Sequence, residues 1–332
     1  MVKDEALHPV TNLSPVVEGN NKVVKNSPAA LPSHYVTAAT SDNTRKAYQS
    51  DIRQFMNWGG LLPATTDTIV RYLHEKASEL NHRTLSRHLT ALSHWHHYQS
   101  FPDPTSHPLV KKTLAGIKNI HGKPKQQAKA MTLDELALII DYLKPQNNLI
   151  AIRNNALIQL CYFGAFRRSE LVTIKWQDIS FSNQGIQICI PKSKTDQSGE
   201  GQMIAIPYGN DKLCAVTALK NWQEKSKLTD DFVFRRIDKA QRISELSIRP
   251  SHVNYLVKSL ATTCKLDDAE LYSAHSLRRG FATEASRKGA TFKSIMQQGR
   301  WKSQGTVLEY IEAGQRFEDN AVSEIFRASE KT

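Results

Sequence analysis

Apolar residues recur at the spacing of an α-helix between residues 48 and 98 of the chain. Tyr48, Ile52 and Phe55 stand at positions i, i+4 and i+7, and the stretch from Arg83 to Tyr98 repeats the pattern. This spacing puts the apolar side chains on one face of each helix, and such a face must be buried against another element. Residues 33–120 are therefore expected to pack as an all-helical domain.

The pattern changes after a polar, basic segment at residues 121–130, which has no periodicity and predicts a linker. Thr132 then precedes an apolar run and predicts a capped helix. Residues 186–190 and 203–206 alternate apolar and polar side chains and predict strands, and everything from residue 250 has a helical period. The expected fold is mainly α with a small antiparallel β-sheet. The expected organisation is a mobile tail over 1–32, a helical domain over 33–120, a linker over 121–130 and an α+β domain with a C-terminal helix over 131–332.

The charge of the chain points to a polyanionic partner. Its 332 residues include 44 Lys or Arg against 32 Asp or Glu, a net charge of +12. Residues 33–130 hold 13 basic residues against 6 acids, so the surplus is concentrated there. Nucleic acid is the commonest polyanion, and a basic linker between two basic domains suggests a clamp around a duplex. The candidate contacts with this nucleic acid are Arg83, Arg87, His96, Lys111, Lys112, Lys118, Lys123 and Lys125.

Several other classes of protein are disfavoured. No apolar run approaches the ~20 residues that span a bilayer, and the first residues lack the layout of a signal peptide. The four cysteines are scattered without a Cys-x-x-Cys pair, which predicts a reduced compartment, either bacterial cytoplasm or nucleus. His94, His96 and His97 face different ways on a helix, so no metal is expected. No nucleotide-binding or metalloprotease motif is present, and no cofactor is expected.

Three short segments carry residues suited to chemistry on a phosphate. Residues 164–171 place two arginines beside an acid, and arginine suits phosphate because its planar fork donates two hydrogen bonds at fixed charge. His275 and Arg278 stand at i and i+3, so both point the same way from a helical turn. Trp301 is followed nine residues later by Tyr310. Each segment by itself is more typical of an ordinary surface.

In combination, their order and spacing resemble the tyrosine recombinases, the family of phage integrases and Cre-like site-specific recombinases. The resemblance covers about residues 41–327, and Trp301 stands where many members have His. Lys194 in the loop between the predicted strands matches the family's hairpin lysine, with Lys192 as a competitor. Arg168 and Arg279 are neighbouring cations that compete with the matched arginines. The catalytic set implied by the resemblance is Arg167, Lys194, His275, Arg278, Trp301 and Tyr310, with Glu170 orienting Arg167.

The resemblance implies that Tyr310 attacks a DNA phosphate and forms a 3′-phosphotyrosyl link. Arg167 and Arg278 would stabilise the charge that gathers on the phosphate oxygens. An indole donates a hydrogen bond but carries no proton for exchange, which leaves His275 as the proton acceptor for Tyr310. Lys194 is then the candidate acid for the leaving 5′-oxygen. The bond energy stays in the phosphotyrosine, so neither ATP nor a metal is required.

The resemblance also implies that the protein binds double-stranded DNA and assembles as a homotetramer on an inverted-repeat site. It further implies a bacterial protein of the cytoplasm that is associated with the nucleoid and belongs to a mobile genetic element. A short apolar face formed by Ala321, Val322, Ile325 and Phe326 predicts a helix that docks on a neighbouring protomer, or else within the monomer. Alternatives are a type IB topoisomerase-like enzyme that relaxes DNA, a hairpin-forming protelomerase, and a DNA-binding regulator without catalysis. Tyr310 and Trp301 at these positions disfavour the regulator, which has no use for them.

Overall fold

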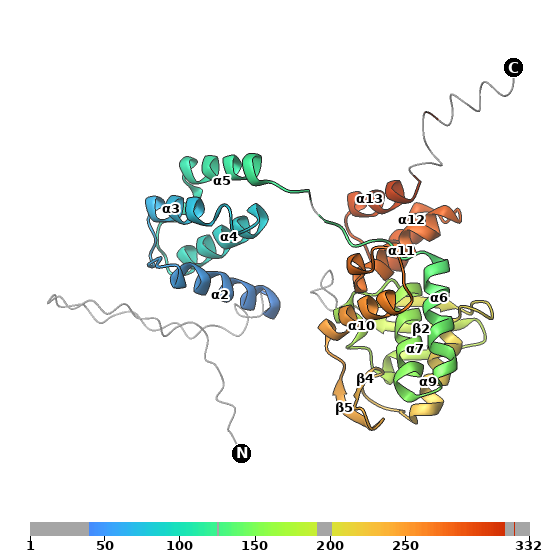
Figure 1. Ribbon diagram of the computed structural model, residues 1–332. Coiled ribbons are helices and arrows are strands. Elements are labelled where there is room, and N and C mark those ends of the chain that lie inside the picture. Colours follow the sequence, from blue (N-terminus) through green and yellow to red (C-terminus); the bar gives the residue numbers. More distant parts are fainter. Residues whose placement is uncertain (1–39, 125, 191–200, 316–321, 323–332) are drawn as a thin grey trace, which may run out of the picture. The chain divides into compact units, whose positions relative to one another are not determined.

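The computed structural model describes residues 40–124, 126–190, 201–315 and 322. The predicted tail over 1–32 and the residues Lys125, Lys192 and Lys194 lie outside this part of the chain, as do Ala321, Ile325 and Phe326. The chain divides into two compact units, one up to residue 125 and one from residue 126 (Figure 1). Both are mainly helical and small antiparallel sheets occur in the second, so the predicted fold class is confirmed.

The first unit is a set of amphipathic helices around one apolar core. Phe55, Leu73 and Leu85 are fully buried there, as the helical spacing predicted. Each helix begins at a residue whose side chain accepts from a backbone N–H of the first turn. Thr65 serves this purpose for the second helix. The helices are α2 (Asp42–Asn57), α3 (Thr66–Lys76), α4 (His82–Tyr98) and α5 (Pro108–His121), with a 3₁₀ turn at Pro104–Ser106.

A buried polar chain connects three of these helices. Asp51 on α2 accepts from Arg87 on α4 at 2.7 and 2.8 Å, and the Nε2 atom of His88 lies 3.3 Å from the same carboxylate. The other ring nitrogen of His88 lies 2.6 Å from the hydroxyl of Tyr72 on α3. A buried carboxylate needs such partners to offset its desolvation. The structure buries His88 completely.

The second unit is built around α7 (Leu149–Phe163), a helix buried on nearly every side. It packs against α6, α9 and α11 (Figure 1). Thr132 caps α6 through a capping box with Glu135, which confirms the cap read from the sequence. The remaining helices of this unit are α6 (Leu133–Leu143), α8 (Arg168–Leu171), α9 (Ala215–Ser226), α10 (Pro250–Thr263), α11 (Ala274–Arg287), α12 (Phe292–Gly299) and α13 (Gln304–Gln315), with 3₁₀ turns at Lys144–Gln146, Trp176–Asp178 and Ala269–Leu271.

Two small sheets complete the second unit. The strands β1 (Ile179–Phe181), β2 (Gly185–Ile190) and β3 (Gln202–Pro207) pair antiparallel in that order. Ile186 faces Ile206, and Ile188 faces Ile204, so the alternating residues of the two predicted strands bury one common face. A second pair, β4 (Arg235–Ile237) and β5 (Ile243–Ser247), forms a two-stranded ribbon that the sequence did not predict.

The chain that enters the second unit is hydrogen-bonded to α11 and the turn before it. The backbone N–H of Lys129 donates to Leu271 at 3.2 Å, and that of Met131 donates to Ser276 at 3.1 Å. Arg279 on α11 donates to the carbonyl of Ala128 at 2.9 Å. Gly280 permits this approach, because a Cβ there would lie 2.0 Å from the carbonyl oxygen of Met131. Within the predicted linker, Ala128 and Lys129 therefore take part in these contacts, and the first linker residue, His121, belongs to α5.

Candidate active site

His275 and Tyr310 come together from the N-terminal turn of α11 and from α13. The Nε2 atom of His275 lies 2.9 Å from the Tyr310 hydroxyl, a hydrogen-bonding distance. Ser273 caps α11 and accepts from the backbone of His275, which fixes the start of the helix. Further along α11, the hydroxyl of Thr283 donates to the carbonyl of Tyr310 at 3.0 Å. The nucleophile predicted from the sequence therefore faces a ring nitrogen that can accept its proton.

The environment of Tyr310 holds its hydroxyl in the neutral form. Burial raises the pKa of Tyr310, and the nearby charges of Arg278 and Arg279 offset only part of this effect, so the pKa stays above its usual value. The guanidinium carbon of Arg279 lies 5.4 Å from the centre of the Tyr310 ring. A neutral phenol is a weak nucleophile, and attack requires that a neighbouring group take its proton.

Arg278 is buried between the turn after α7 and the end of α12. Its guanidinium donates to the carbonyls of Ala165 and Gly299, and the ring of Trp301 lies 4.2 Å from its central carbon. Burial, followed by repulsion from Arg167 and Arg300, lowers the pKa of Arg278 to about 9. The side chain is still charged at neutral pH. An arginine held this rigidly is a preorganised donor, since it loses little freedom when an anion binds.

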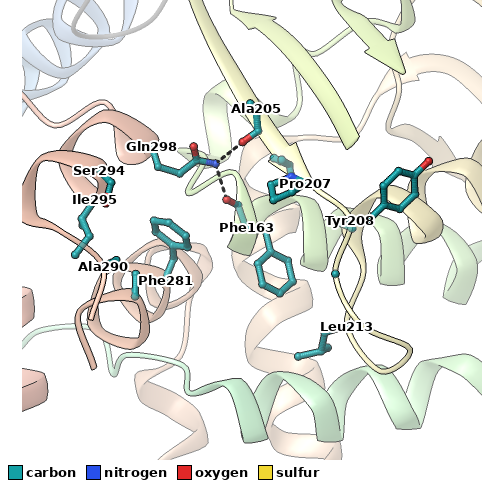
Figure 2. Close-up of a pocket in the computed structure, with 14 residues that line it drawn as sticks. Phe163, Ala205, Pro207, Tyr208, Leu213, Phe281, Ala290, Ser294, Ile295 and Gln298 are labelled. Carbon is teal, nitrogen blue, oxygen red and sulfur yellow. Dashed lines mark hydrogen bonds between the residues drawn. The ribbon is translucent and has the colours of Figure 1, made fainter. Parts of the chain in front are cut away.

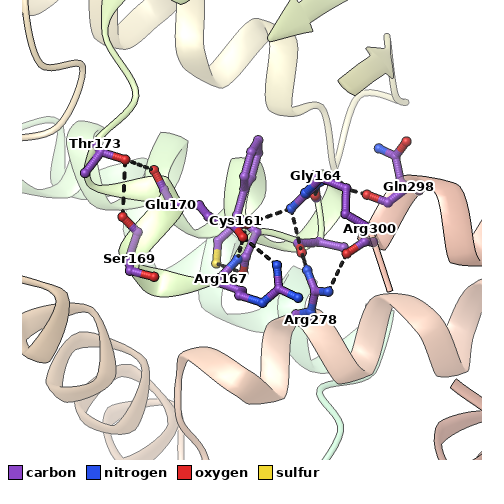
Figure 3. A network of polar contacts seen from close by, with 12 residues as sticks. Cys161, Gly164, Arg167, Ser169, Glu170, Thr173, Arg278, Gln298 and Arg300 are labelled. Carbon is purple, nitrogen blue, oxygen red and sulfur yellow. Dashed lines mark hydrogen bonds and ion pairs between the residues drawn. The ribbon is translucent and has the colours of Figure 1, made fainter. Parts of the chain in front are cut away.

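Arg167 is held by Glu170 at the start of α8. The Glu170 carboxylate accepts from the backbone N–H of Arg167 at 3.0 Å and from its guanidinium at 2.6 Å. It also accepts from Arg300 at 2.9 Å (Figure 3). Burial alone would raise the pKa of Glu170, but the charge of Arg300 and the hydrogen bond from Arg167 outweigh it, and the pKa lies below its usual value. Glu170 is therefore an ionised carboxylate shared by two arginines.

Arg300 is a member of this cluster that the sequence prediction omitted. It precedes Trp301 within a segment that the sequence marks as a candidate, but its own role depends on the backbone. Arg300 ends α12 in the left-handed conformation with φ of 56°, which turns its side chain inward. Only 7% of the residue is exposed. Thr283 is likewise absent from the predicted set, since nothing in its spacing distinguishes it from a packing residue.

The cluster carries an excess of positive charge. Among the described residues, the guanidiniums of Arg167, Arg278 and Arg300 face a single carboxylate, that of Glu170. Three cations against one anion in a mostly buried space leave an unbalanced charge, which a bound anion would offset. Trp301 lies next to Tyr310, with 6.1 Å between the ring centres, and its indole N–H has no hydrogen-bond partner among the described residues. The arrangement is suited to a phosphate that is attacked by a tyrosine.

The structure unites five of the six predicted catalytic residues, together with Glu170. Lys194, the sixth, lies outside the described residues. Of the two neighbouring cations, Arg168 is exposed at the start of α8, whereas Arg279 contacts the ring of Tyr310. Arg167 is held by Glu170, and Arg278 lies against the ring of Trp301. The geometry therefore favours Arg167 over Arg168, and Arg278 over Arg279.

The predicted DNA contacts of the first unit lie mostly on its surface. Arg83 on α4 and Lys111 and Lys118 on α5 line a groove of about 400 Å³ between these helices. Lys112 and Lys123 are also exposed, and Arg83 donates to the carbonyl of Lys123 at 3.2 Å. The side chain of Arg87 is half exposed while it pairs with buried Asp51. Lys125 is outside the described residues.

His96 is a correction to the predicted DNA contacts. It is fully buried, and Nε2 accepts from the backbone N–H of Ala64 at 2.9 Å, while Nδ1 lies 2.8 Å from the carbonyl of Leu92. Both ring nitrogens are therefore used inside the first unit. The role of His96 is to anchor the loop before α3, and it has no surface to offer DNA.

The second unit also has an apolar groove of about 380 Å³ (Figure 2). Phe163 on α7, Phe281 on α11 and Ile295 on α12 contribute to its lining. Gln298 spans one edge, where its side-chain N–H groups donate to the carbonyls of Phe163 and Ala205 at 2.9 and 3.1 Å. Among the described residues, no helix is both long and apolar enough to cross a membrane.

Comparison with known proteins gives consistent matches. The sequence profile of the phage integrase family matches residues 129–316. An integrase/recombinase XerD homolog of Selenomonas ruminantium is 37% identical over 295 residues, which cover 86% of this chain and 86% of that protein. The recombinase Cre of Escherichia phage P1 is 27% identical over 295 residues, covering 82% and 84%.

Solved structures share the fold. The XerH site-specific recombinase bound to a palindromic difH substrate, in its post-cleavage complex, aligns with a TM-score of 0.63 at 17% identity, over 86% of this chain and 80% of that one. A lambda integrase dimer bound to a COC′ core site aligns with a TM-score of 0.61 at 17% identity, over 86% and 77%.

Proposed function

This chain belongs to the phage integrase family and is a tyrosine recombinase, an enzyme that transfers DNA strands, and we propose that it does so through a covalent 3′-phosphotyrosyl link to Tyr310. The observation that carries the proposal is the 2.9 Å contact between the Tyr310 hydroxyl and His275, beside a cluster with surplus positive charge. The nucleophile, its proton acceptor and the anion-binding donors occupy one site.

The proposed reaction uses these residues together with Lys194, whose role is implied by the resemblance to the family. The Tyr310 oxygen attacks the phosphorus, and its proton passes to Nε2 of His275. The bond from phosphorus to the 5′-oxygen breaks, and Lys194 supplies the proton that makes the 5′-hydroxyl a leaving group. Arg167 and Arg278 stabilise the charge on the non-bridging oxygens, because each terminal nitrogen of a guanidinium carries a second hydrogen for donation. A 5′-hydroxyl from a partner strand reverses the same steps and rejoins the DNA.

A nicked suicide substrate tests the covalent step. Once cut, such a substrate loses its 5′-hydroxyl fragment, so the protein remains attached and is detected on a denaturing gel. Tyr310→Phe is expected to abolish the adduct while DNA binding is retained. Tyr255→Phe is the matched control, because Tyr255 is 67% exposed on α10 and should form the adduct normally. An adduct that persists with Tyr310→Phe would refute the assignment.

We propose that the basic surface of the first unit binds the DNA backbone. Lys111 and Lys118 support this, since both are exposed and line the same groove as Arg83. Contacts with phosphates release counterions, so the double variant Lys111→Gln, Lys118→Gln should bind every duplex more weakly. Its affinity should also depend less steeply on salt, by about one unit of logarithmic slope for each lysine. Lys225→Gln in the second unit is the control, and an equal effect of that variant would contradict the proposal.

We also propose that protomers assemble as a tetramer on an inverted-repeat site through their C-terminal segments. The apolar residues of that segment and the apolar groove of the second unit support this pairing. Removal of residues 317–332 should preserve binding of one protomer to a half-site and abolish pairing of two sites. Ala290→Glu, on the groove, should have the same effect, and the two changes together should be no worse. Leu246→Glu, on β5, is the control. Assembly that survives both changes would contradict this role.

A further inference from the structure

We propose that Arg300 is a positioning residue, which holds Glu170 in place and through it fixes Arg167 at the phosphate. This inference rests on the proposed function, because Arg167 must act on the phosphate for its position to matter. Arg300 itself need not touch DNA. Its effect passes through one carboxylate, and this makes the role separable from that of the arginines that contact the substrate.

The contacts of Arg300 span three segments that carry the site. One terminal nitrogen donates to the carbonyls of Gly164 at 3.1 Å and Gln298 at 2.8 Å. The other donates to Ala165 at 3.3 Å and to the Glu170 carboxylate at 2.9 Å (Figure 3). The guanidinium also lies 5.0 Å from the ring of Phe166. Arg300 therefore clamps the turn before Arg167 to the end of α12.

The backbone at Arg300 is the second part of the observation. A residue other than glycine with φ of 56° adopts a conformation that L-residues rarely occupy, at a cost of about 1 kcal/mol. A protein keeps such an unfavourable conformation only where contacts of the surrounding structure stabilise it. Here the left-handed turn directs the side chain inward toward Glu170 and leaves the next residue, Trp301, against Tyr310. One turn thus places both the buried guanidinium of Arg300 and the indole ring of Trp301 in the site.

Glu170 is fully engaged only when Arg300 is present. One of its oxygens accepts from the Arg167 guanidinium, and the other accepts from the Arg167 backbone and from Arg300. Arg167 uses one terminal nitrogen on Glu170. Its remaining donors have no hydrogen-bond partner among the described residues and are available to an anion. Loss of Arg300 would remove the only one of these three hydrogen bonds that ties the carboxylate to α12, so Glu170 and Arg167 would be held less firmly.

The charged groups around Glu170 determine how the removal of Arg300 would change the pH dependence of activity. Arg167 faces it from the start of α8, Arg300 from the end of α12 and Arg278 from α11, while the neutral thiol of Cys161 lies on α7. Burial raises the pKa of Glu170, and Arg300 gives the largest opposing effect. Without Arg300 the pKa moves upward. A protonated Glu170 no longer holds Arg167 as an ion pair. When the pH is lowered, the activity of a variant without Arg300 should therefore begin to fall at a higher pH than the activity of the unmodified protein.

The test measures single-turnover cleavage of the nicked suicide substrate at saturating DNA, from about pH 5 to pH 9. Arg300→Gln should slow cleavage about 10- to 100-fold at neutral pH, as expected for a misplaced donor. Its loss of rate on the acid side should begin at a higher pH. Arg300→Lys keeps the charge but has one nitrogen for four acceptors, so it should be slow without this shift in pH. Arg287→Gln is the control, an arginine in a 2.9 Å pair with Glu284 on α11.

Glu170→Gln separates positioning from any direct role. Glutamine does not titrate in this range, so the acid-side shift should vanish in the double variant Glu170→Gln, Arg300→Gln. Cleavage by the double variant should be no slower than that of Glu170→Gln alone, because both changes remove the same link. The proposal would be overturned if the double variant lost the product of the two single rate reductions. It would also be overturned if the rate of Arg300→Gln fell at the same pH as the rate of the unmodified protein. Thermal melting shows which variants are folded, and failure of the unmodified protein to form the adduct would instead reject the proposed function.

Discussion

Replacement of Trp301 tests whether an indole serves the reaction as a hydrogen-bond donor. Trp301 is 9% exposed, and its ring lies 4.2 Å from the guanidinium carbon of Arg278. Trp301→Phe keeps an aromatic face for Arg278 and removes the N–H. A weaker cation–π contact costs about 0.5–1 kcal/mol, or roughly 2- to 5-fold in rate. A lost transition-state donor costs about 10²–10³-fold, so the donor dominates the expected defect.

Trp301→His supplies the contrast, because it shortens the side chain but retains an N–H. We expect single-turnover cleavage at saturating DNA to fall at least about 10²-fold with phenylalanine and only about 10-fold with histidine. The control is Trp222→Phe, which removes an indole that donates to the carbonyl of Val233 at 2.8 Å in the core. That variant should lower the melting temperature and leave cleavage unchanged at a permissive temperature. A phenylalanine variant as fast as the histidine variant would refute the reasoning.

Three further predictions concern α11 and its contacts. Gly280→Ala should lower the melting temperature, because the new Cβ would lie 2.0 Å from a backbone carbonyl, whereas Gly116→Ala, with nothing within 4 Å, should not; equal melting temperatures would contradict this. Arg279→Gln removes a charge that lowers the pKa of Tyr310, so that pKa should rise and the rate–pH profile should move to higher pH; an unmoved profile would count against the contact. Thr283→Val removes a 3.0 Å hydrogen bond to Tyr310 and should slow cleavage a few-fold, and an unchanged rate would show that this bond does not position the nucleophile.

The parts of the fold that the sequence predicted are those with a strong local period. The helices around Phe55 and Leu85, the cap at Thr132 and the strands that pair Ile188 with Ile204 all follow from side chains within a few positions of one another. The ribbon of β4 and β5 lacks such a signal, because its strands are three and five residues long and partly exposed. The helix α9 was not predicted either, although Val216, Leu219 and Trp222 are spaced to form one buried face.

The residues of the site also fall into those that local spacing predicts and those that it does not. His275 and Arg278 share a helical turn, so their common direction follows from spacing alone. Arg300 depends on a left-handed backbone and on a carboxylate 130 positions away, and neither is visible in a local pattern. His96 and His88 show the opposite error. Their residue type suggests a polar surface, but hydrogen bonds to both ring nitrogens of His96, and contacts with Tyr72 and Asp51 for His88, allow burial.

The hydrogen bonds between residues 128–131 and the α11 region have a mechanical consequence. A pull on the chain at Ala128 acts directly on Arg279, and a pull at Met131 acts on Ser276, one residue after His275. Tension in the connection between the two units is thus transmitted to the helix that carries two of the predicted catalytic residues.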